Sequence, residues 1–382
     1  MVISITVCWF EYLRRTGHKV DVISQSHPNY YHNLLSLIER LGKLPLDILL
    51  QDEATHPAFF LLNQRLRARV SYPIISIVHH LRSSERRPTW QNWIYGDIER
   101  RYLMTVDGFV FNSHTTRRTV ERITGTKCPS VVAYPCGDRF LMNITDEEIV
   151  TRVKQPGPLR IVFVGNIIRR KELHSLLAAL SRLPREICIL TIVGDLSMDK
   201  PYVHTIYRQV AESKLDGRVI FLGSLPDTEL VARLKESHVL VVPSSYEGFG
   251  IVYLEGMGFG LPAIASTAGA ASEIITHGKD GLLIRVGDAA SLAQYLHDLS
   301  LDRDWLLSMS LNARRRFESH PTWQMTTERI RVFLETMLNN NASKAPAPCP
   351  SAPRYLTAPG LSPRVPGEPL PSRDSVRYTR HR

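Results

Sequence analysis

The sequence predicts an α/β protein with two doubly wound domains. Short apolar runs of strand composition alternate with helix-periodic segments, which favours parallel strands with helices on both faces. The alternation forms two separate series, and 382 residues are many for a single hydrophobic core. Candidate strands are 19–24, 47–51, 73–78, 108–111 and 130–133 in the first series, and 159–164, 187–193, 218–221, 239–242, 262–265 and 281–284 in the second.

Domain boundaries are expected where this alternation stops. We predict a first Rossmann-like domain at 1–140, a linker at 141–158 and a second Rossmann-like domain at 159–321. A helix at 322–340 is expected to pack back toward the first domain. Two such domains facing one another would place a cleft at the carboxyl ends of their strands, where open α/β sheets bind ligands.

The last segment, 341–382, is expected to be disordered. It is rich in proline, serine and arginine without apolar periodicity, so it cannot bury enough surface to offset its ordering entropy. Residues 342–382 carry +5 of the net charge of +10. Because the basic excess is concentrated there and no base-stacking module is recognisable, nucleic-acid binding is not predicted. A solubilising extension is favoured over weak adhesion to acidic membranes.

Cysteine usage and hydropathy bear on the compartment. The five cysteines show no paired spacing or companion histidines for a metal, and their odd number argues against a disulfide framework. No run approaches the roughly 18 apolar residues of a spanning helix, and the start of the chain lacks the basic residues of a secretory signal. We predict a cytoplasmic protein and leave peripheral membrane contact open.

The most informative segment is 244–264, in which two glutamates flank a glycine loop. A strand-like run leads into this loop, and glycines turn the chain before apolar residues resume. Glu247 lies on the loop, and Glu255 lies about one turn inside the helix that is expected to follow. Taken alone, the pattern favours two solvated glutamates at a strand-to-helix turn.

The same loop suits a nucleoside diphosphate sugar. The amides of Gly250, Ile251 and Val252 would be the unpaired first donors of the helix, at the positive end of its dipole. Glycines let a diphosphate approach these amides closely. Glu255 is then placed to accept hydrogen bonds from a ribose diol.

A second turn of the same kind occurs earlier in the chain. A buried strand at 159–164 is followed by Gly165 and by the basic residues Arg169, Arg170 and Lys171. Cations at such a turn can clamp a diphosphate and neutralise charge on a departing nucleotide. A basic triplet is by itself more often a solvated face, but two such turns in one α/β series favour the functional interpretation.

Five segments resemble, in this order, the retaining GT-B glycosyltransferases of family four (glycosyl transferases group 1): VGNIIRRKELHSLLAAL, IVGD, FLGSLPDTEL, PSSYEGFGIVYLEGMGFGLPAIAS and AGAASEIITHGKDGLL. The resemblance is strong through 159–299. It is moderate from 17 to 140, where RRTGHKVDVIS, SIVHHL, DGFVFNSHTT and PCGDRF have the right character and order. It implies a GT-B fold, with two Rossmann-like domains facing a cleft.

The resemblance also implies roles for individual residues of the glutamate loop. Glu247 matches the first glutamate of the family's paired motif, beside the transferred sugar, and Glu255 matches the second, which holds the ribose. Phe249, Gly250 and Ile251 match the loop whose amides meet the sugar and phosphates.

Lys171 matches the family's phosphate-binding lysine, six residues after Gly165, and Arg170 is the expected second cation. Asn166 stands where members of the family often carry arginine, next to the diphosphate. His79, just past the strand PIISIV, matches a histidine near the donor sugar, with His80 as the alternative.

The implied activity is metal-independent transfer of a hexosyl unit, with retention, from a UDP- or GDP-linked sugar to a hydroxyl of a saccharide or lipid-linked acceptor. No cofactor is implied. The departing phosphate is expected to deprotonate the acceptor, so that Glu247 positions and stabilises rather than attacks. A catalytically impaired nucleotide-sugar-binding subunit and a sugar-nucleotide epimerase on the same scaffold remain alternatives. Base, sugar, acceptor and oligomeric state are left open.

Several features depart from the family pattern. Glu172 stands where glycine is common, and the helix bearing Glu255 is expected to contain Gly256, Gly258 and Gly260, each costing up to about 1 kcal/mol. The chain starts at what looks like the family's first helix, so a preceding strand and glycine-rich loop are expected to be missing. This favours the impaired-subunit alternative.

A basic and aromatic stretch follows the histidines of the first domain. One interpretation is contact with an anionic lipid-linked or phosphorylated acceptor at a membrane face. The favoured interpretation is an ordinary interdomain loop with two core tryptophans. The stretch contains Arg82, Arg86, Arg87, Trp90, Trp93 and Tyr95.

Overall fold

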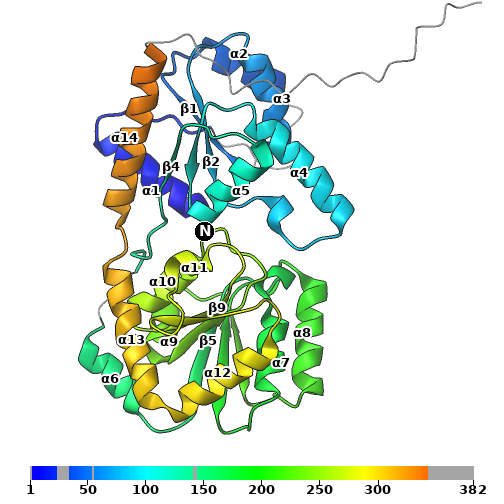
Figure 1. Cartoon of the computed structure of the whole chain (residues 1–382), viewed down its shortest axis with the longest axis vertical. Coiled ribbons are helices and arrows are strands. Elements are labelled where there is room, and N and C mark those ends of the chain that lie inside the picture. The colour runs from blue at the N-terminus through cyan, green and yellow to red at the C-terminus, as the bar shows by residue number, and fades with distance from the viewer. Residues whose placement is uncertain (1, 24–33, 54–55, 141–143, 343–382) are drawn as a thin grey trace, which may run out of the picture. The chain divides into compact units, whose positions relative to one another are not determined.

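The computed structural model describes residues 2–23, 34–53, 56–140 and 144–342 (Figure 1). Within these residues the strands form two sheets, and every neighbouring pair of strands is parallel. The predicted α/β class with two parallel sheets is therefore confirmed. The segment predicted to be disordered, 341–382, lies outside the described residues from residue 343 onward.

The first domain is built on a four-stranded sheet in the order β1-β2-β3-β4. Its helices include five α-helices and a short 3₁₀ helix, η2, among the described residues. The elements are α1 (Val2–Arg15), α2 (Leu34–Lys43), β1 (Leu49–Asp52), α3 (His56–Leu66), β2 (Ile74–Val78), η2 (Arg82–Ser84), α4 (Thr89–Leu103), β3 (Gly108–Phe111), α5 (His114–Thr124) and β4 (Ser130–Val132).

The prediction of a strand at 19–24 is wrong for residues 19–23, which the structure describes. Residues 19–23 are irregular, and Ser24 lies outside the described range. The carbonyl oxygen of Val20 accepts hydrogen bonds from the side chain of Arg14 rather than from a strand. Val20 packs against the core cluster of the sheet, but Val22 is 55% exposed, so only part of the segment is buried. On its outer side β1 pairs with no other described strand, and local apolar composition cannot replace that missing partner.

The second domain is built on a six-stranded sheet in the order β10-β9-β8-β5-β6-β7. All six strands lie within two residues of their predicted bounds. The elements are α6 (Asp146–Lys154), β5 (Leu159–Val164), η3 (Arg169–Lys171), α7 (Leu173–Leu180), β6 (Cys188–Val193), α8 (Lys200–Glu212), β7 (Val219–Gly223), α9 (Asp227–Glu236), β8 (Val239–Val242), α10 (Ile251–Gly258), β9 (Ala263–Ser266), α11 (Ala271–Ile274), β10 (Gly281–Ile284), α12 (Ala289–Leu301) and α13 (Arg303–Glu318).

The order of this sheet contains a switch point. The chain moves outward from β5 to β6 and β7, then returns to the other side of β5 with β8. Open α/β sheets bind ligands at such a point, outside the carboxyl ends of the two strands. The segments that follow β5 and β8 are the predicted phosphate turn and the predicted glutamate loop.

The core of the second domain explains why its strands formed as predicted. Strand β8 is buried along its whole length, as expected for a parallel strand covered on both faces. Figure 1 shows the sheet between α7 and α8 on one side and α10 and α13 on the other. Within the predicted linker, a capping box at Thr145 and Glu148 starts α6, which buries Ile149 and Val153 in this core.

The last described helix, α14 (Trp323–Ala342), packs on the first domain. Its residues Ile330, Leu334 and Met337 are buried with Trp9 of α1 and with Ile75 and Ile77 of β2, among others. The chain thus begins and ends its described part on the same face of the first sheet.

Candidate active site

The candidate site forms where two turns of the second domain meet. The amide of Ser245 donates to the carbonyl oxygen of Arg170 over 2.8 Å. The Arg170 side chain donates in turn to the carbonyl oxygen of Tyr246, also over 2.8 Å. The turn after β5 and the loop after β8 are therefore bonded to one another directly.

A buried ion pair lies at this junction. Oε1 of Glu247 lies 2.6 Å from Nζ of Lys171 and 3.2 Å from Nη1 of Arg170. It also accepts a hydrogen bond from Oγ of Ser244 at 2.7 Å. Burial alone would raise the pKa of the Glu247 carboxyl, but the two cations and these hydrogen bonds lower that pKa to about 2. Glu247 is therefore ionised at neutral pH.

The second glutamate has different surroundings. Glu255 in α10 is only 4% exposed, and its Oε1 has no hydrogen-bond partner among the described residues. The guanidinium of Arg139 approaches that oxygen to 3.9 Å and is bonded to Asp227 instead. Burial raises the pKa of the Glu255 carboxyl to about 7, and Arg139 offsets only part of this effect. A buried carboxylate with an unused acceptor suits the hydroxyl groups of a sugar.

The loop between the two glutamates requires glycine. Gly250 has a φ of 98°, and a Cβ there would lie 2.4 Å from the ring of Tyr253. Helix α10 begins at the next residue, so the amides of Ile251 and Val252 belong to its first turn, where donors have no partner within the helix. Phe249 is buried and anchors the loop.

Of the other residues predicted to lie near the diphosphate, some adjoin the Glu247 ion pair and others have different neighbours. Gly165 adjoins the phosphate-turn lysine, since an added Cβ would lie 3.4 Å from Cε of Lys171. Asn166 is exposed, and its amide contacts a methionine sulfur. Arg169 lies over the ring of Tyr202, with its guanidinium carbon 5.7 Å from the centroid. Of the basic triplet, only Arg170 and Lys171 contact Glu247.

Two departures from the family pattern have structural explanations. Glu172 has a φ of 55°, in the left-handed region that glycine favours, and its carboxylate accepts a hydrogen bond from Oγ of Ser175. The expectation that Gly260 lies inside a helix is wrong. Helix α10 ends at Gly258, and Gly260 has a φ of 63°, where glycine is favoured.

His79 lies directly against the glutamate loop. A Cβ at Gly248 would be 2.2 Å from the carbonyl oxygen of His79. The ring is buried, and its Nε2, 3.8 Å from Oδ2 of Asp52, has no hydrogen-bond partner among the described residues. Burial lowers the pKa of this imidazole, so it is neutral at pH 7. Glu53 accepts hydrogen bonds from the amides of His79 and His80 and so orients the segment.

The second domain also binds the amino-terminal end of α5. The carbonyl oxygen of Gly248 accepts a hydrogen bond from Oγ of Ser113 at 2.7 Å. Glu273 of α11 accepts from the amides of His114 and Thr115 at 2.9 and 2.6 Å. A carboxylate at this position accepts hydrogen bonds from unpaired amides of the helix, and its negative charge is stabilised by the positive end of the helix dipole. Glu273 therefore caps a first-domain helix from the second domain.

Four residues that organise the site were given no role by sequence reasoning: Arg139, Glu53, Ser113 and Glu273. Glu53 and Ser113 could have been found from their positions in the sequence. They follow the ends of β1 and β3, at the edge where parallel sheets bind ligands. For Arg139 and Glu273 no local signal exists, since their partners are distant in the chain.

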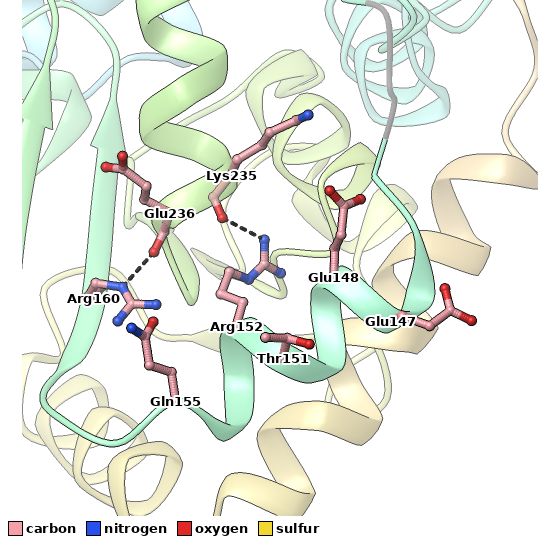
Figure 2. Close-up of a pocket in the computed structure, with 8 residues that line it drawn as sticks. All are labelled: Glu147, Glu148, Thr151, Arg152, Gln155, Arg160, Lys235 and Glu236. Atoms are coloured by element: carbon pink, nitrogen blue, oxygen red, sulfur yellow. Dashed lines mark hydrogen bonds between the residues drawn. The ribbon is translucent and has the colours of Figure 1, made fainter.

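A separate pocket of about 510 Å³ lies on the second domain and contains none of the predicted site residues. Figure 2 shows Arg152 and Arg160 directed at the end of α9, where they donate to the carbonyl oxygens of Lys235 and Glu236. Arg152 also donates to the carbonyl oxygen of Phe259. These arginines satisfy carbonyl groups at helix ends. The lining residues are Glu147, Glu148, Thr151, Arg152, Gln155, Arg160, Lys235 and Glu236.

In the described part of the chain, no group of three or more His, Cys, Asp or Glu residues is arranged to hold a metal ion. No described helix combines the length and apolar composition that crossing a bilayer requires.

Comparisons with known proteins bear on the class of this site. Residues 145–316 match the family described as glycosyl transferases group 1. Glycogen synthase from Mycobacterium tuberculosis is 25% identical over 321 residues, which are 79% of this chain and 73% of that protein.

Two solved structures share the fold. Sucrose-phosphate synthase from Thermosynechococcus elongatus gives a TM-score of 0.72 at 21% identity, covering 87% of this chain and 92% of that one. HepE from Anabaena, in complex with UDP and glucose, gives 0.66 at 19% identity, covering 85% and 88%. The chain thus has the two-domain GT-B fold of these structures. The match to the glycosyl transferases group 1 family covers residues 145–316, which are less than half of the chain.

We expect Glu255→Gln to stabilise the ligand-free protein at pH 8 by up to about 3 kcal/mol and to have little effect near pH 4.5. With a pKa of about 7 in the folded state against 4.5 in the unfolded chain, Glu255 binds more protons when folded. Its favourable contribution is therefore lost as the pH rises from 4.5 to 7, and glutamine avoids that loss. Urea unfolding at both pH values measures the difference. Glu318→Gln on α13 is the control, and a stabilisation independent of pH would contradict the raised pKa.

We expect Glu273→Ala to loosen the contact between the domains while each domain stays folded. The variant removes the acceptor for two amides of α5, so small-angle scattering should report a larger radius of gyration. The catalytic efficiency should fall by about tenfold to 100-fold, because the first-domain residues no longer hold their place. Glu318→Ala, at an exposed carboxylate, is the control. Unchanged scattering and unchanged catalytic efficiency together would refute this role.

Proposed function

We propose that this protein transfers a hexosyl unit from a nucleoside diphosphate sugar to an acceptor hydroxyl, with retention at the anomeric carbon and without a metal ion. The observation that carries the proposal is the buried contact of Glu247 with Lys171 and Arg170, together with the buried Oε1 of Glu255, which has no hydrogen-bond partner among the described residues. Two cations, an ionised carboxylate and a carboxyl oxygen able to accept hydrogen bonds from sugar hydroxyl groups are thus provided by the segments at the switch point of the sheet.

The nucleoside diphosphate sugar would be held by charge complementarity between its phosphates and the site. A diphosphate competes with Glu247 for Lys171 and Arg170, and the first amides of α10 add further donors. Glu247 is then released toward the hydroxyl groups of the sugar. Glu255 accepts hydrogen bonds from the ribose, which anchors the nucleoside beside the helix.

Transfer would proceed on one face of the sugar. The bond from the anomeric carbon to the phosphate oxygen breaks, the acceptor oxygen bonds to the same carbon, and the acceptor proton passes to the departing phosphate. Lys171 and Arg170 stabilise the negative charge on the leaving group. Metal-independent transfer is proposed because these cations and the helix terminus can supply that stabilisation.

Glu247 is assigned to stabilisation rather than to nucleophilic attack. Its pKa of about 2 keeps it ionised, so it stabilises positive charge that develops on the sugar. The hydrogen bond that Oγ of Ser244 donates to Oε1 reduces the nucleophilicity of that oxygen. His79, neutral and with Nε2 unpartnered among the described residues, is proposed to hydrogen-bond the donor sugar.

The donor to test first is a UDP-sugar, because the HepE structure holds UDP and glucose. A GDP-sugar is the comparison. Acceptors to test are saccharides and lipid-linked saccharides. Release of nucleoside diphosphate that depends on both substrates supports transfer. Donor binding without turnover would favour the binding-subunit alternative, and donor isomerisation without an acceptor would favour an epimerase.

We expect Glu247→Gln and Lys171→Ala each to lower the transfer rate by at least about 100-fold, because each removes charge stabilisation in a buried site. Lys279→Ala, at an exposed lysine of the same domain, should leave the rate unchanged. Nucleoside diphosphate release measures the rates, and circular dichroism checks folding. Near-normal activity in either site variant would exclude the proposed role of this ion pair.

A further inference from the structure

Helix α4 carries an apolar face that no other part of the described chain covers. Trp90 is 63% exposed, Trp93 74% and Ile94 42%. The expectation that both tryptophans are core residues is therefore wrong. Residues three and four apart share one side of a helix, so these side chains project together. Figure 1 shows α4, in cyan, on the outside of the first domain.

Only the last turns of α4 are buried, which explains the exposure. Tyr102 and Leu103 pack in the core of the first domain, whereas the first two turns extend beyond it. The buried carboxylate of Glu99 accepts hydrogen bonds from the amides of Arg82 and Ser83. The preceding loop is thus fixed against the helix. A fixed platform loses little conformational entropy on binding a surface.

Three exposed arginines lie in the segment that leads into α4: Arg82, Arg86 and Arg87, of which Arg82 and Arg87 lie over the ring of Tyr95. The segment 82–94 contains one carboxylate, that of Glu85, which is bonded to His80 at 2.8 Å and to Arg87 at 2.6 Å. The segment that carries the two indoles therefore has a net positive charge. We name the surface formed by Arg82, Arg86, Arg87, Trp90, Trp93 and Ile94 the α4 face.

We propose that the α4 face docks on the surface of a bilayer that contains anionic lipids. Indole rings favour the boundary between lipid headgroups and acyl chains, and arginines favour the phosphates at the same depth. Exposed apolar side chains together with cations in one segment are the chemistry of interfacial binding. A nucleic acid could bind the arginines through its phosphates, but nucleic-acid binding does not explain an exposed isoleucine.

The α4 face adjoins the candidate active site. His80, which is bonded to Glu85, has its ring centroid 5.2 Å from that of Tyr246, the residue before Glu247. A bilayer bound there would bring the hydroxyl groups of a lipid-linked acceptor to the edge of the site. This delivery role rests on the proposed transfer, whereas the bilayer binding does not.

The test is co-sedimentation of the full chain with vesicles, without donor or acceptor. One set of vesicles contains phosphatidylcholine alone, and the other also contains phosphatidylglycerol. We expect binding to the anionic vesicles, weakened at least about tenfold in Trp90→Ala/Trp93→Ala because buried indole area is lost. Arg86→Gln should reduce both the binding and its salt dependence. Leu35→Ala/Leu301→Ala, which removes side chains that are 70% and 69% exposed elsewhere, should bind as wild type does.

Three results would overturn the proposal. They are no binding to anionic vesicles, equal binding by wild type and the tryptophan double variant, and binding of duplex DNA that the double variant loses while vesicle binding stays unchanged. Equal binding would assign the affinity to another segment, such as the basic residues beyond 342. Nucleoside diphosphate release with a soluble acceptor is measured separately, so a failure of transfer and a failure of bilayer binding are distinguishable.

Discussion

The buried contact between Glu247 and Lys171 is the interaction on which the rest of the site depends. Both side chains are 10% exposed, and neither charge would be tolerated there without the other. The contact also joins the segments that follow β5 and β8, two strands that the sheet order makes neighbours. The fold thus brings together a carboxylate and two cations that lie 76 and 77 residues apart in the chain, as their numbers show. A phosphate that displaces the carboxylate meets cations already in position.

Two glutamates of one short segment have opposite electrostatic behaviour, and this difference defines their proposed tasks. Cations hold Glu247 ionised, whereas burial without a close partner brings the pKa of Glu255 near neutrality. Environments that separate two carboxyl groups in this way are typical of functional sites. The first domain adds His79, whose carbonyl group contacts Gly248 and whose imidazole is neutral. The site is therefore a product of both domains, held by the cap of Glu273 on α5.

Sequence reasoning recovered the parts of the fold that local pattern determines. Strands β8 and β9 of the second domain are continuous apolar runs buried along their whole length, so their composition sufficed. The strand at 19–24 failed because strand formation also needs a partner that composition cannot reveal. The loop glycines were recognised as a turn, but the left-handed conformation of Glu172 and the exposure of Trp90 and Trp93 depend on distant packing. Arg139 and Glu273 have partners far along the chain, which no local pattern indicates.

A crystal structure with a UDP-sugar bound would test the proposed donor site. We predict that phosphate oxygens replace Glu247 at Lys171 and Arg170, and that the ribose hydroxyls lie within hydrogen-bond distance of Glu255. A nucleotide bound elsewhere, for example in the pocket of Figure 2, with the Glu247 to Lys171 contact of 2.6 Å intact would contradict this prediction.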